Sequence, residues 1–303
     1  MRTVRAISDL REALAPERRA GRTIGLVPTM GYFHEGHLSL MRSARADCDV
    51  VVVSLFVNPA QFGPGEDLAA YPRDEQRDSA LAEREGVDIL FAPGEEQVYP
   101  HGFATSVTVD GLTDVLCGDP GRRGPEHFRG VTTVVTKLFN MVGPDVAYFG
   151  QKDAQQALVI RRLVRDLDVP VRIEVCPTMR DPDGLALSSR NAYLSAGERQ
   201  RALGLSRALR AAEATLARGV TDGAAVLEAA RGELAREGIE PEYLELRSTH
   251  DLSPAARVNG STLLAVAARV GRARLIDNTI LNATAPPERS PSSPEPTQEE
   301  PPR

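Results

Sequence analysis

Short apolar runs alternate with amphipathic segments along the first half of the chain. The run at 50–57 is mostly valine and has no polar alternation, which is typical of a parallel strand covered on both faces. The same pattern predicts strands at 24–27, 50–57, 87–91, 147–149 and 171–175 and helices at 38–46, 73–85, 131–141 and 154–167. Strands that alternate with helices in this way predict a doubly wound, Rossmann-like α/β parallel sheet.

The pattern changes after about residue 178. Two Ala- and Leu-rich helices are predicted at 198–218 and 224–237, followed by short strands at 243–246, 262–267 and 273–277. From residue 285 the chain is Pro, Ser and Glu with almost nothing apolar, which is typical of a disordered tail. We therefore expect a Rossmann-like domain over 1–178, a smaller α+β domain over 179–284 and a disordered tail over 285–303.

Composition narrows the class of protein. Hydrophobic residues make up 42% and charged residues 26%, as in ordinary globular proteins, and the net charge of −6 argues against a general nucleic-acid binder. The longest apolar run falls far short of the roughly 18 residues that a membrane helix needs. Three cysteines lie far apart, which favours neither a disulfide framework nor a zinc site. We expect a cytoplasmic protein with no membrane or nucleic-acid partner.

The residues after the first strand carry the strongest chemical signal. There the sequence runs VPTMGYFHEGHLSL, with His34 and His37 three residues apart. A strand that ends where a helix begins presents free backbone N–H groups, which favour anions such as phosphate. The glycines Gly31 and Gly36 would let a ligand approach the backbone closely. The alternatives are two histidines in an ordinary surface turn, or a metal site, which lacks a third ligand nearby.

Three further groups of polar residues follow predicted strands or turns. Asn58 and Gln61 offer amides suited to hydroxyls and a carboxylate, although Asn58-Pro59 is also a plausible turn. Lys152 would neutralise phosphate charge beside Asp153, unless the two form a solvated pair. The segment 188–190 combines small hydroxyls with a guanidinium, which are good phosphate ligands, but it also fits a helix-capping Ser beside a solvated Arg.

A resemblance to a known family rests on five blocks in a fixed order. The sequence is similar to the pantoate–β-alanine ligase family, within the nucleotidyltransferase and class I aminoacyl-tRNA synthetase superfamily that carries an HxGH motif. The resemblance covers roughly residues 1–283. The blocks are 34–37 (HEGH), 56–62 (FVNPAQF), 127–131 (HFRGV), 149–156 (FGQKDAQQ) and 183–191 (DGLALSSRN).

The resemblance implies a reaction and its reactants. Members condense (R)-pantoate with β-alanine, using ATP and Mg²⁺, and release pantothenate, AMP and diphosphate through a pantoyl-adenylate intermediate. The resemblance also implies a homodimer whose partners are otherwise small molecules, and a mobile phosphate-binding loop around 188–190, like the KMSKS loop of the related synthetases.

The resemblance also implies roles for individual residues. The catalytic residues would be His34, His37, Lys152 and Arg190. Pantoate and β-alanine would be bound by Asn58, Gln61, Gln156 and Arg123. ATP would be bound by Met30, Gly31, His34, Gly36, His37, Gly150, Gln151, Lys152, Asp153, Met179, Leu187, Ser188, Ser189 and Arg190.

A few positions depart from the family pattern. The basic residue before the HFRG block is displaced by one position, so either Arg123 or Arg122 would take its place. Gln151 stands where the family often has Glu, and Leu187 replaces a frequent Met, a swap that conserves volume. The acidic pair often seen after the Tyr-Pro-Arg segment is Arg77-Asp78 here, which leaves Asp78 as the candidate metal ligand.

Two other functions fit part of the sequence. A nucleotidylyltransferase of the same superfamily would share the HEGH turn, but it would not need the amides of Asn58, Gln61 and Gln156 and would not depend on β-alanine. A non-catalytic nucleotide-binding module would keep the phosphate contacts without the substrate side. The requirement for β-alanine and the formation of AMP distinguish these alternatives.

Overall fold

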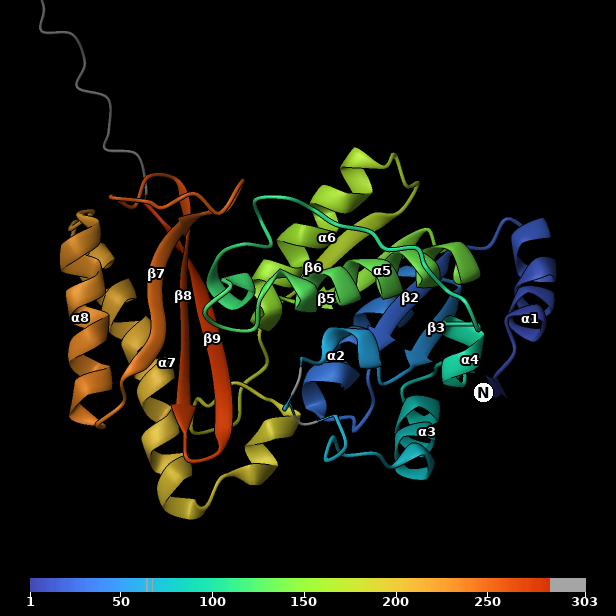
Figure 1. Ribbon diagram of the computed structural model, residues 1–303, viewed down its shortest axis with the longest axis horizontal. Helices are drawn as coiled ribbons and strands as arrows, with labels where there is room; N and C mark the ends of the chain where they lie inside the picture. The colour runs from blue at the N-terminus through green and yellow to red at the C-terminus, as the bar shows by residue number, and fades with distance from the viewer. Residues whose placement is uncertain (64, 67, 284–303) are drawn as a thin grey trace, which may run out of the picture.

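The computed structural model describes residues 1–63, 65, 66 and 68–283. The predicted disordered tail at 285–303 lies outside the described residues. Within them the chain forms two sheets that lie side by side (Figure 1), a six-stranded parallel sheet and a three-stranded antiparallel sheet. The α/β prediction for the first part and the α+β prediction for the second are both confirmed.

The parallel sheet has the strand order β1-β4-β3-β2-β5-β6. From β2 the chain first builds outward through β3 and β4, and then returns to place β5 on the other side of β2. The carboxyl ends of β2 and β5 therefore flank the point where strand order reverses, which is where open α/β sheets bind ligands. The strands are β1 (Arg2–Val4), β2 (Ile24–Thr29), β3 (Val50–Leu55), β4 (Ile89–Phe91), β5 (Val146–Gly150) and β6 (Arg172–Cys176).

Helices cover both faces of the parallel sheet. On one face α1 (Ile7–Arg19), α5 (Pro125–Val142) and α6 (Ala154–Asp166) share a core with the inward side chains of β2 to β5. On the other face α2 (Glu35–Asp47) and α3 (Glu75–Arg84) pack against the alternate side chains of the same strands. Because each strand alternates its side chains between two cores, the buried valine run at β3 needs no polar face.

The antiparallel sheet is also covered on both faces. Its strands are β7 (Pro241–Ser248), β8 (Ser261–Val270) and β9 (Ala273–Asn282), in that order. Leu264 and Val266 of β8 pack against α7 (Ala196–Ala217) and α8 (Gly223–Arg236). The alternate residues Leu263 and Ala265 instead join the core of α5 and α6. The second sheet thus lies between its own helices and the parallel-sheet part of the molecule (Figure 1).

Several elements differ from the sequence prediction. Strand β1 and helix α1 were not predicted as such, and α5 begins at Pro125 rather than at 131. Gly124 precedes this helix with φ 80°, and the proline occupies its first turn, where its missing N–H costs nothing. Short helical segments are α4 (Glu95–Val98) and the 3-10 helices η1 (Pro59–Gln61), η2 (Leu116–Gly118), η3 (Gln151–Asp153) and η4 (Ser189–Tyr193).

Among the helices of the described residues, none combines the length and the apolar character needed to cross a membrane.

Candidate active site

The turn between β2 and α2 is held by a buried carboxylate. Gly31 and Tyr32 both have positive φ, 86° and 53°, so the chain reverses sharply as it leaves the strand. Asp78 of α3, only 1% exposed, accepts hydrogen bonds from the backbone N–H groups of Tyr32 at 2.6 Å and Phe33 at 2.7 Å. Burial raises the pKa of Asp78, and these two donors oppose that rise. The carboxylate therefore fixes the turn that presents His34.

The two histidines cap helix α2 with their own rings. His34 is the N-cap residue, and its Nδ1 accepts from the N–H of Gly36 at 3.1 Å. Nδ1 of His37 accepts from the N–H of His34 at 3.3 Å, which completes a capping box. The ring centroids lie 4.2 Å apart. Because each Nδ1 is an acceptor, each neutral ring carries its proton on Nε2 and can donate it to a ligand.

The electrostatic surroundings keep both rings neutral. Burial and the charge of Lys152 lower the pKa of His34 to about 4. Burial, with smaller effects of His34 and Lys152, holds the pKa of His37 well below its usual value. Protonation would also remove the acceptor that caps the helix. At neutral pH the site therefore presents two uncharged N–H donors.

The amides predicted to bind substrate occupy different positions. Asn58 is 1% exposed, and its Nδ2 donates to Gly130 O at 3.0 Å and to Gln61 Oε1 at 3.1 Å. Its Oδ1 accepts from the N–H of Ala60 at 3.3 Å and from the Tyr99 hydroxyl at 2.7 Å. All its hydrogen-bonding capacity is thus used within the protein. Asn58 orients Gln61, whose own amide lies at the cavity wall.

Of the two candidate arginines, Arg123 is the one at the cavity. It forms a two-point ion pair with Glu66, at 2.6 and 2.7 Å, and lies 3.2 Å from His127 Nε2. His127 Nδ1 donates to the carbonyl of Gln61 at 2.7 Å, and burial lowers the pKa of this histidine to about 4. Arg122 instead pairs with Glu245 at 3.1 Å, on the antiparallel sheet.

Lys152 and Asp153 lie in η3, directly after β5. Within the described part of the chain, the Lys152 ammonium makes no hydrogen bond or ion pair, and it lines the cavity next to His34 and His37. The Asp153 carboxylate is exposed and is likewise unpaired among the described residues. Gln156 follows on the first turn of α6 and faces the same space. This strand end therefore supplies a cation, an anion and an amide.

A loop from β6 toward α7 covers the other side of the site. Leu187 N–H donates to Met179 O at 3.0 Å, and the backbones of Arg180 and Ala186 form an isolated antiparallel β-bridge. The loop therefore folds back on itself. Ser188 then caps η4, its hydroxyl accepting from the N–H of Arg190 at 3.3 Å. This small hairpin brings Ser188, Ser189 and Arg190 to the cavity edge.

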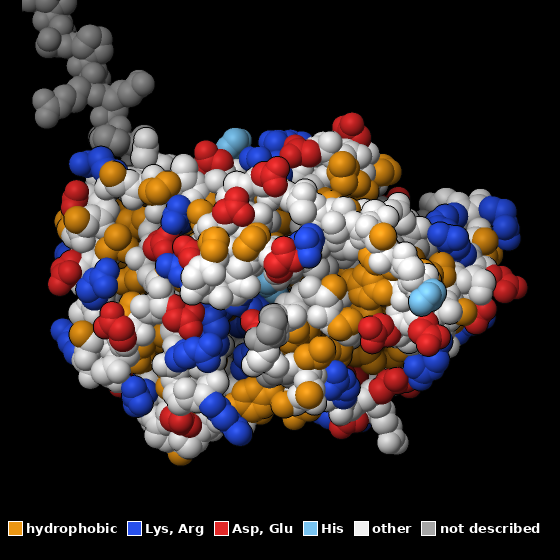
Figure 2. Space-filling view, in the orientation of Figure 1, with side chains coloured by type: hydrophobic (Ala, Val, Ile, Leu, Met, Phe, Trp, Pro, Cys, Tyr) orange, Lys and Arg blue, Asp and Glu red, His pale blue; other side chains and the backbone are white. Residues whose placement is uncertain are grey.

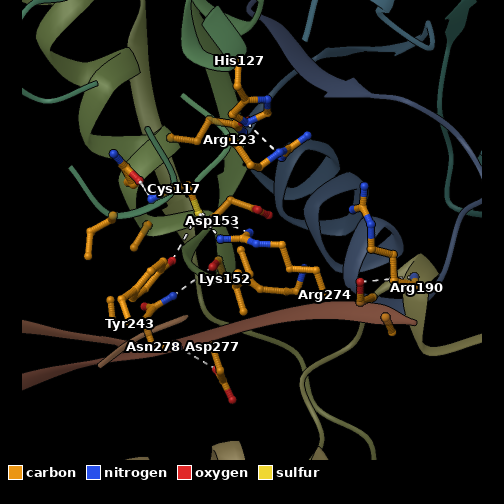
Figure 3. A pocket seen from close by; sticks show the side chains of 18 of the residues that line it. Cys117, Arg123, His127, Lys152, Asp153, Arg190, Tyr243, Arg274, Asp277 and Asn278 are labelled. Atoms are coloured by element: carbon orange, nitrogen blue, oxygen red, sulfur yellow. Dashed lines mark hydrogen bonds between the residues drawn. The ribbon is translucent and has the colours of Figure 1, made fainter. Parts of the chain in front are cut away.

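Two adjoining cavities, of about 240 and 530 Å³, hold most of the predicted site. The smaller lies against the histidines. The larger lies between η3 and the antiparallel sheet, with Lys152, Asp153, Arg190 and Arg274 around it (Figure 3). The residues that line both are Arg123, His127, Lys152, Asp153, Gln156, Ser188 and Arg190. The smaller cavity is also lined by Met30, His34, Gly36, His37, Asn58, Gln61, Gly150, Met179, Leu187 and Ser189.

Three predicted site residues do not line either cavity. Gly31 lies within the turn, where a Cβ would stand 2.5 Å from Leu55 Cδ1 and 3.0 Å from Asp78 Oδ2. The Gln151 amide donates to Asn278 Oδ1 at 2.9 Å. The carboxylate of Asp78 accepts hydrogen bonds from the backbone of the turn, and its predicted role as a metal ligand stays a prediction. No group of three or more His, Cys, Asp or Glu side chains among the described residues is arranged to hold a metal ion.

Sequence reasoning did not assign some residues that the fold brings to the site. His127 lines both cavities, and its HFRG block was the signal that pointed to it. Arg269, Arg272 and Arg274 come from β8, β9 and the turn between them, far along the chain. Lys and Arg side chains also gather near the middle of the face in Figure 2, between the two sheets. The surroundings of the larger cavity suit an anionic ligand.

Comparison with known proteins agrees with this geometry. The family model described as pantoate-beta-alanine ligase matches residues 2–280. The chain is 53% identical to the pantothenate synthetase of Moorella thermoacetica and 51% identical to that of Thermotoga neapolitana. Each match spans 93% of this chain, and 99% and 100% of the respective relative.

Solved structures give the same result. Pantothenate synthetase from Thermus thermophilus is 49% identical with a TM-score of 0.87, over 92% of this chain and 99% of that one. Pantoate-beta-alanine ligase from Francisella tularensis, solved as a complex with β-γ ATP and β-alanine, is 34% identical with a TM-score of 0.75, over 92% and 97%. With the family model matched along nearly its whole described length, this chain belongs to the pantoate–β-alanine ligase family.

Proposed function

We propose that this chain condenses pantoate with β-alanine through a pantoyl-adenylate intermediate formed beside His34, His37 and Lys152. The observation that carries the proposal is the pair of neutral histidines. Both rings are fixed by capping hydrogen bonds, and both line a cavity that also contains Lys152, whose ammonium has no partner among the described residues. A triphosphate needs donors and positive charge held in place before the reaction begins.

We assign ATP to the edge formed by the β2 turn, η3 and the loop at 188–190. Neither Gly31 nor Gln151 lines a cavity. We propose that they contribute to ATP binding only by shaping the backbone of the β2 turn and of η3. The residues proposed to contact ATP are Met30, His34, Gly36, His37, Gly150, Lys152, Asp153, Met179, Leu187, Ser188, Ser189 and Arg190.

We assign pantoate to the smaller cavity, beside Gln61 and Gln156. Its inner wall is apolar and includes Val131 and Val134, which suits a branched aliphatic acid. Asn58 acts by orienting Gln61. Arg123 supplies positive charge near the carboxylates of the substrates, although its ion pair with Glu66 shares that charge.

The chemistry explains why the site has this composition. A carboxylate does not condense with an amine at neutral pH, because its oxygen is a poor leaving group. Attack of the pantoate carboxylate on the α-phosphorus of ATP forms a mixed anhydride and releases diphosphate. The β-alanine amine then attacks the acyl carbon, and AMP leaves with loss of a proton. The protein aligns the reactants and stabilises charge on the phosphate oxygens through His34, His37 and Lys152.

We also propose that Mg²⁺ accompanies ATP. Among the residues that the structure describes, the acidic side chains lining the two cavities are Glu66, Asp153 and Asp277, and two of them are paired with arginines. Asp153 is therefore the carboxylate with open access to a metal ion. One carboxylate fits Mg²⁺, which is commonly held by one or two carboxylates together with substrate phosphates and water. Bound there, the ion would neutralise phosphate charge.

Two properties of the whole protein complete the proposal. The three cysteines of the chain are free and buried, which supports a reducing compartment such as the cytoplasm. The family resemblance supports a homodimer, which light scattering of the purified protein tests directly.

The deciding experiment measures AMP and diphosphate release with ATP, Mg²⁺ and pantoate, with and without β-alanine. We expect AMP turnover that requires both substrates, with pantothenate accumulating. Diphosphate release at full rate without β-alanine would favour a nucleotidylyltransferase. Binding of ATP with no turnover would favour a non-catalytic module.

A further inference from the structure

Building on the proposed function, we propose that Asn278 of β9 is a positioning residue for Lys152. Asn278 lies on the antiparallel sheet, whereas Lys152 follows a strand of the parallel sheet. The two residues are 126 positions apart in the sequence. Their contact is therefore a property of the folded molecule that no local pattern contains.

The Asn278 side chain binds the backbone of η3 at two consecutive residues. Its Nδ2 donates to the carbonyl of Gln151 at 3.0 Å and to that of Lys152 at 2.9 Å. Its Oδ1 accepts from Gln151 Nε2 at 2.9 Å. Carbonyl oxygens only accept, so the Nδ2 group must face them, and this fixes the orientation of the amide. One side chain thereby holds both peptide units that flank the lysine Cα.

This contact matters because Lys152 has little else to fix it. Its ammonium is unpaired among the described residues, and η3 is a single 3-10 turn. Asp153, at the N-cap position of α6, gives that helix no side-chain capping bond. The clamp from Asn278 therefore fixes the direction in which the lysine leaves the backbone. Figure 3 shows Asn278 lying across from η3 at the cavity wall.

Asn278 is itself held rigidly. It is buried, and its backbone N–H donates to Asp277 Oδ1 at 2.8 Å. Asp277 in turn forms a two-point ion pair with Arg180, at 2.6 and 2.9 Å. Arg180 pairs with Ala186 at the base of the loop that carries Ser188 and Arg190. These two neighbouring residues of β9 thus contact η3, which carries Lys152, and the base of the loop that carries Arg190.

The variant Asn278→Asp tests the clamp, because it replaces the NH2 group, which donates both hydrogen bonds to η3, by an oxygen that accepts. The two side chains have nearly the same volume. We expect kcat for pantoyl-adenylate formation to fall about 10- to 100-fold, the range for misplacing one preorganised group, with the KM for ATP changed less than about threefold. The matched control is Asn282→Asp, the same chemical change at an exposed site on the same strand, which should keep full activity.

A double-mutant cycle separates positioning from general destabilisation. If Asn278 acts through Lys152, then adding Asn278→Asp to Lys152→Ala lowers kcat by less than about twofold relative to Lys152→Ala alone. Single-turnover measurements at high enzyme concentration make the slow variants comparable. Thermal unfolding of each variant gives the separate effect on stability.

Several outcomes would overturn the proposal. The first is an activity of Asn278→Asp within twofold of the Asn282→Asp control. The second is a double variant whose loss of kcat equals the product of the losses of the two single variants. If the buried Asp unfolds the protein, Asn278→Ala removes the donors without adding charge, and unfolding of that variant as well would make the residue purely structural. Absence of ligase activity in the unmodified protein would instead refute the proposed function, which distinguishes the two failures.

Discussion

In the rings of His34 and His37 the two nitrogens have different roles. Nδ1 accepts a backbone N–H inside the turn, and Nε2 keeps its proton for the ligand. A ring in this state has no free lone pair with which to accept a proton. In the proposed function both histidines would therefore be hydrogen-bond donors to phosphate, and the proton released from the β-alanine amine would leave by another route.

Replacing one donor tests this role. We expect His37→Ala to lower turnover at least about 100-fold, or about 3 kcal/mol, as for other preorganised donors to a developing negative charge. The exposed His250→Ala variant is the matched control and should retain full activity. Steady-state AMP release measures both, with circular dichroism to confirm folding. A rate near that of the unmodified protein in His37→Ala would remove His37 from the mechanism.

The depressed histidine pKa values also predict how stability varies with pH. In the folded state the pKa of His34 and of His127 is about 4, whereas an unfolded histidine titrates near 6.5. Below pH 6.5 the unfolded chain takes up protons that the folded protein excludes. Stability should therefore be complete above about pH 6.5 and fall toward pH 4, by about 1.4 kcal/mol per pH unit for each such histidine.

Urea unfolding at pH 7.5 and pH 5.5 measures this slope, above the range in which most carboxylates titrate. The variant His127→Gln should reduce it, because it removes a buried histidine whose pKa is lowered in the folded state. Equal stability at the two pH values would contradict the assignment of neutral, buried histidines.

Sequence reasoning reached different depths for different residues. The histidines were identifiable because their roles depend on a turn contained within a few positions. Asp78 and Asn58 were predicted to bind ligands, and their hydrogen bonds within the protein, to partners 45 and 72 positions away, could not be predicted from local sequence. A polar residue near a strand end can hold a loop or bind a substrate, and only the three-dimensional contacts distinguish the two.

At the level of elements, η1 and α5 approach each other unusually closely. A Cβ at Gly130 would overlap the carbonyl of Ala60 and lie 2.6 Å from Gln61 N. We expect Gly130→Ala to destabilise the fold by about 1–3 kcal/mol. Because the overlap pushes against the residue before Gln61, the KM for pantoate should rise more than the KM for ATP.

The control for this prediction is Gly232→Ala on α8. Apart from its chain neighbours and the nearby backbone of its own helix, no described atom lies within 4 Å of the Cβ it would add, so the change should be neutral or stabilise the helix by up to about 1 kcal/mol. Chemical denaturation and substrate titrations of both variants give the comparison. Equal effects of the two substitutions would mean that close packing at Gly130 is unimportant.

Most regular elements were predictable because their periodicity is strong. Strands β2, β3 and β5 and helices α2 and α6 all lie where the apolar pattern predicted them. Element ends were less accurate, as at the start of α5, where Gly124-Pro125 rather than hydrophobicity begins the helix. Strand β1 has only three residues, too few for alternation to be recognised.

For the whole molecule, the two sheets share one apolar core. Leu263 and Ala265 of β8 belong to the same buried cluster as Leu10 of α1 and Val134 of α5. Alternation along β8 predicts which side chains face inward but not what they face, so the sequence could indicate two parts without indicating this contact. The expected domain boundary near residue 178 stays a prediction.

A shared core predicts cooperative unfolding. Leu263 is fully buried, and we expect Leu263→Ala to lower the free energy of unfolding by about 2–5 kcal/mol. The protein should still unfold in a single transition, with a lower midpoint. The exposed Leu167→Ala is the control. Far-ultraviolet circular dichroism and tyrosine fluorescence should report coincident midpoints. Two separated transitions would show that the parts unfold independently.

The position of Asn278 in the chain bears on how the protein is made. Ribosomes release the histidine turn, η3 and the loop at 188–190 well before β9 emerges, and the earlier part can begin to fold during synthesis. Until β9 joins its sheet, a nascent chain carries these ATP-binding groups without the clamp on Lys152. The proposed clamp on Lys152 can therefore form only after β9 has emerged and joined its sheet.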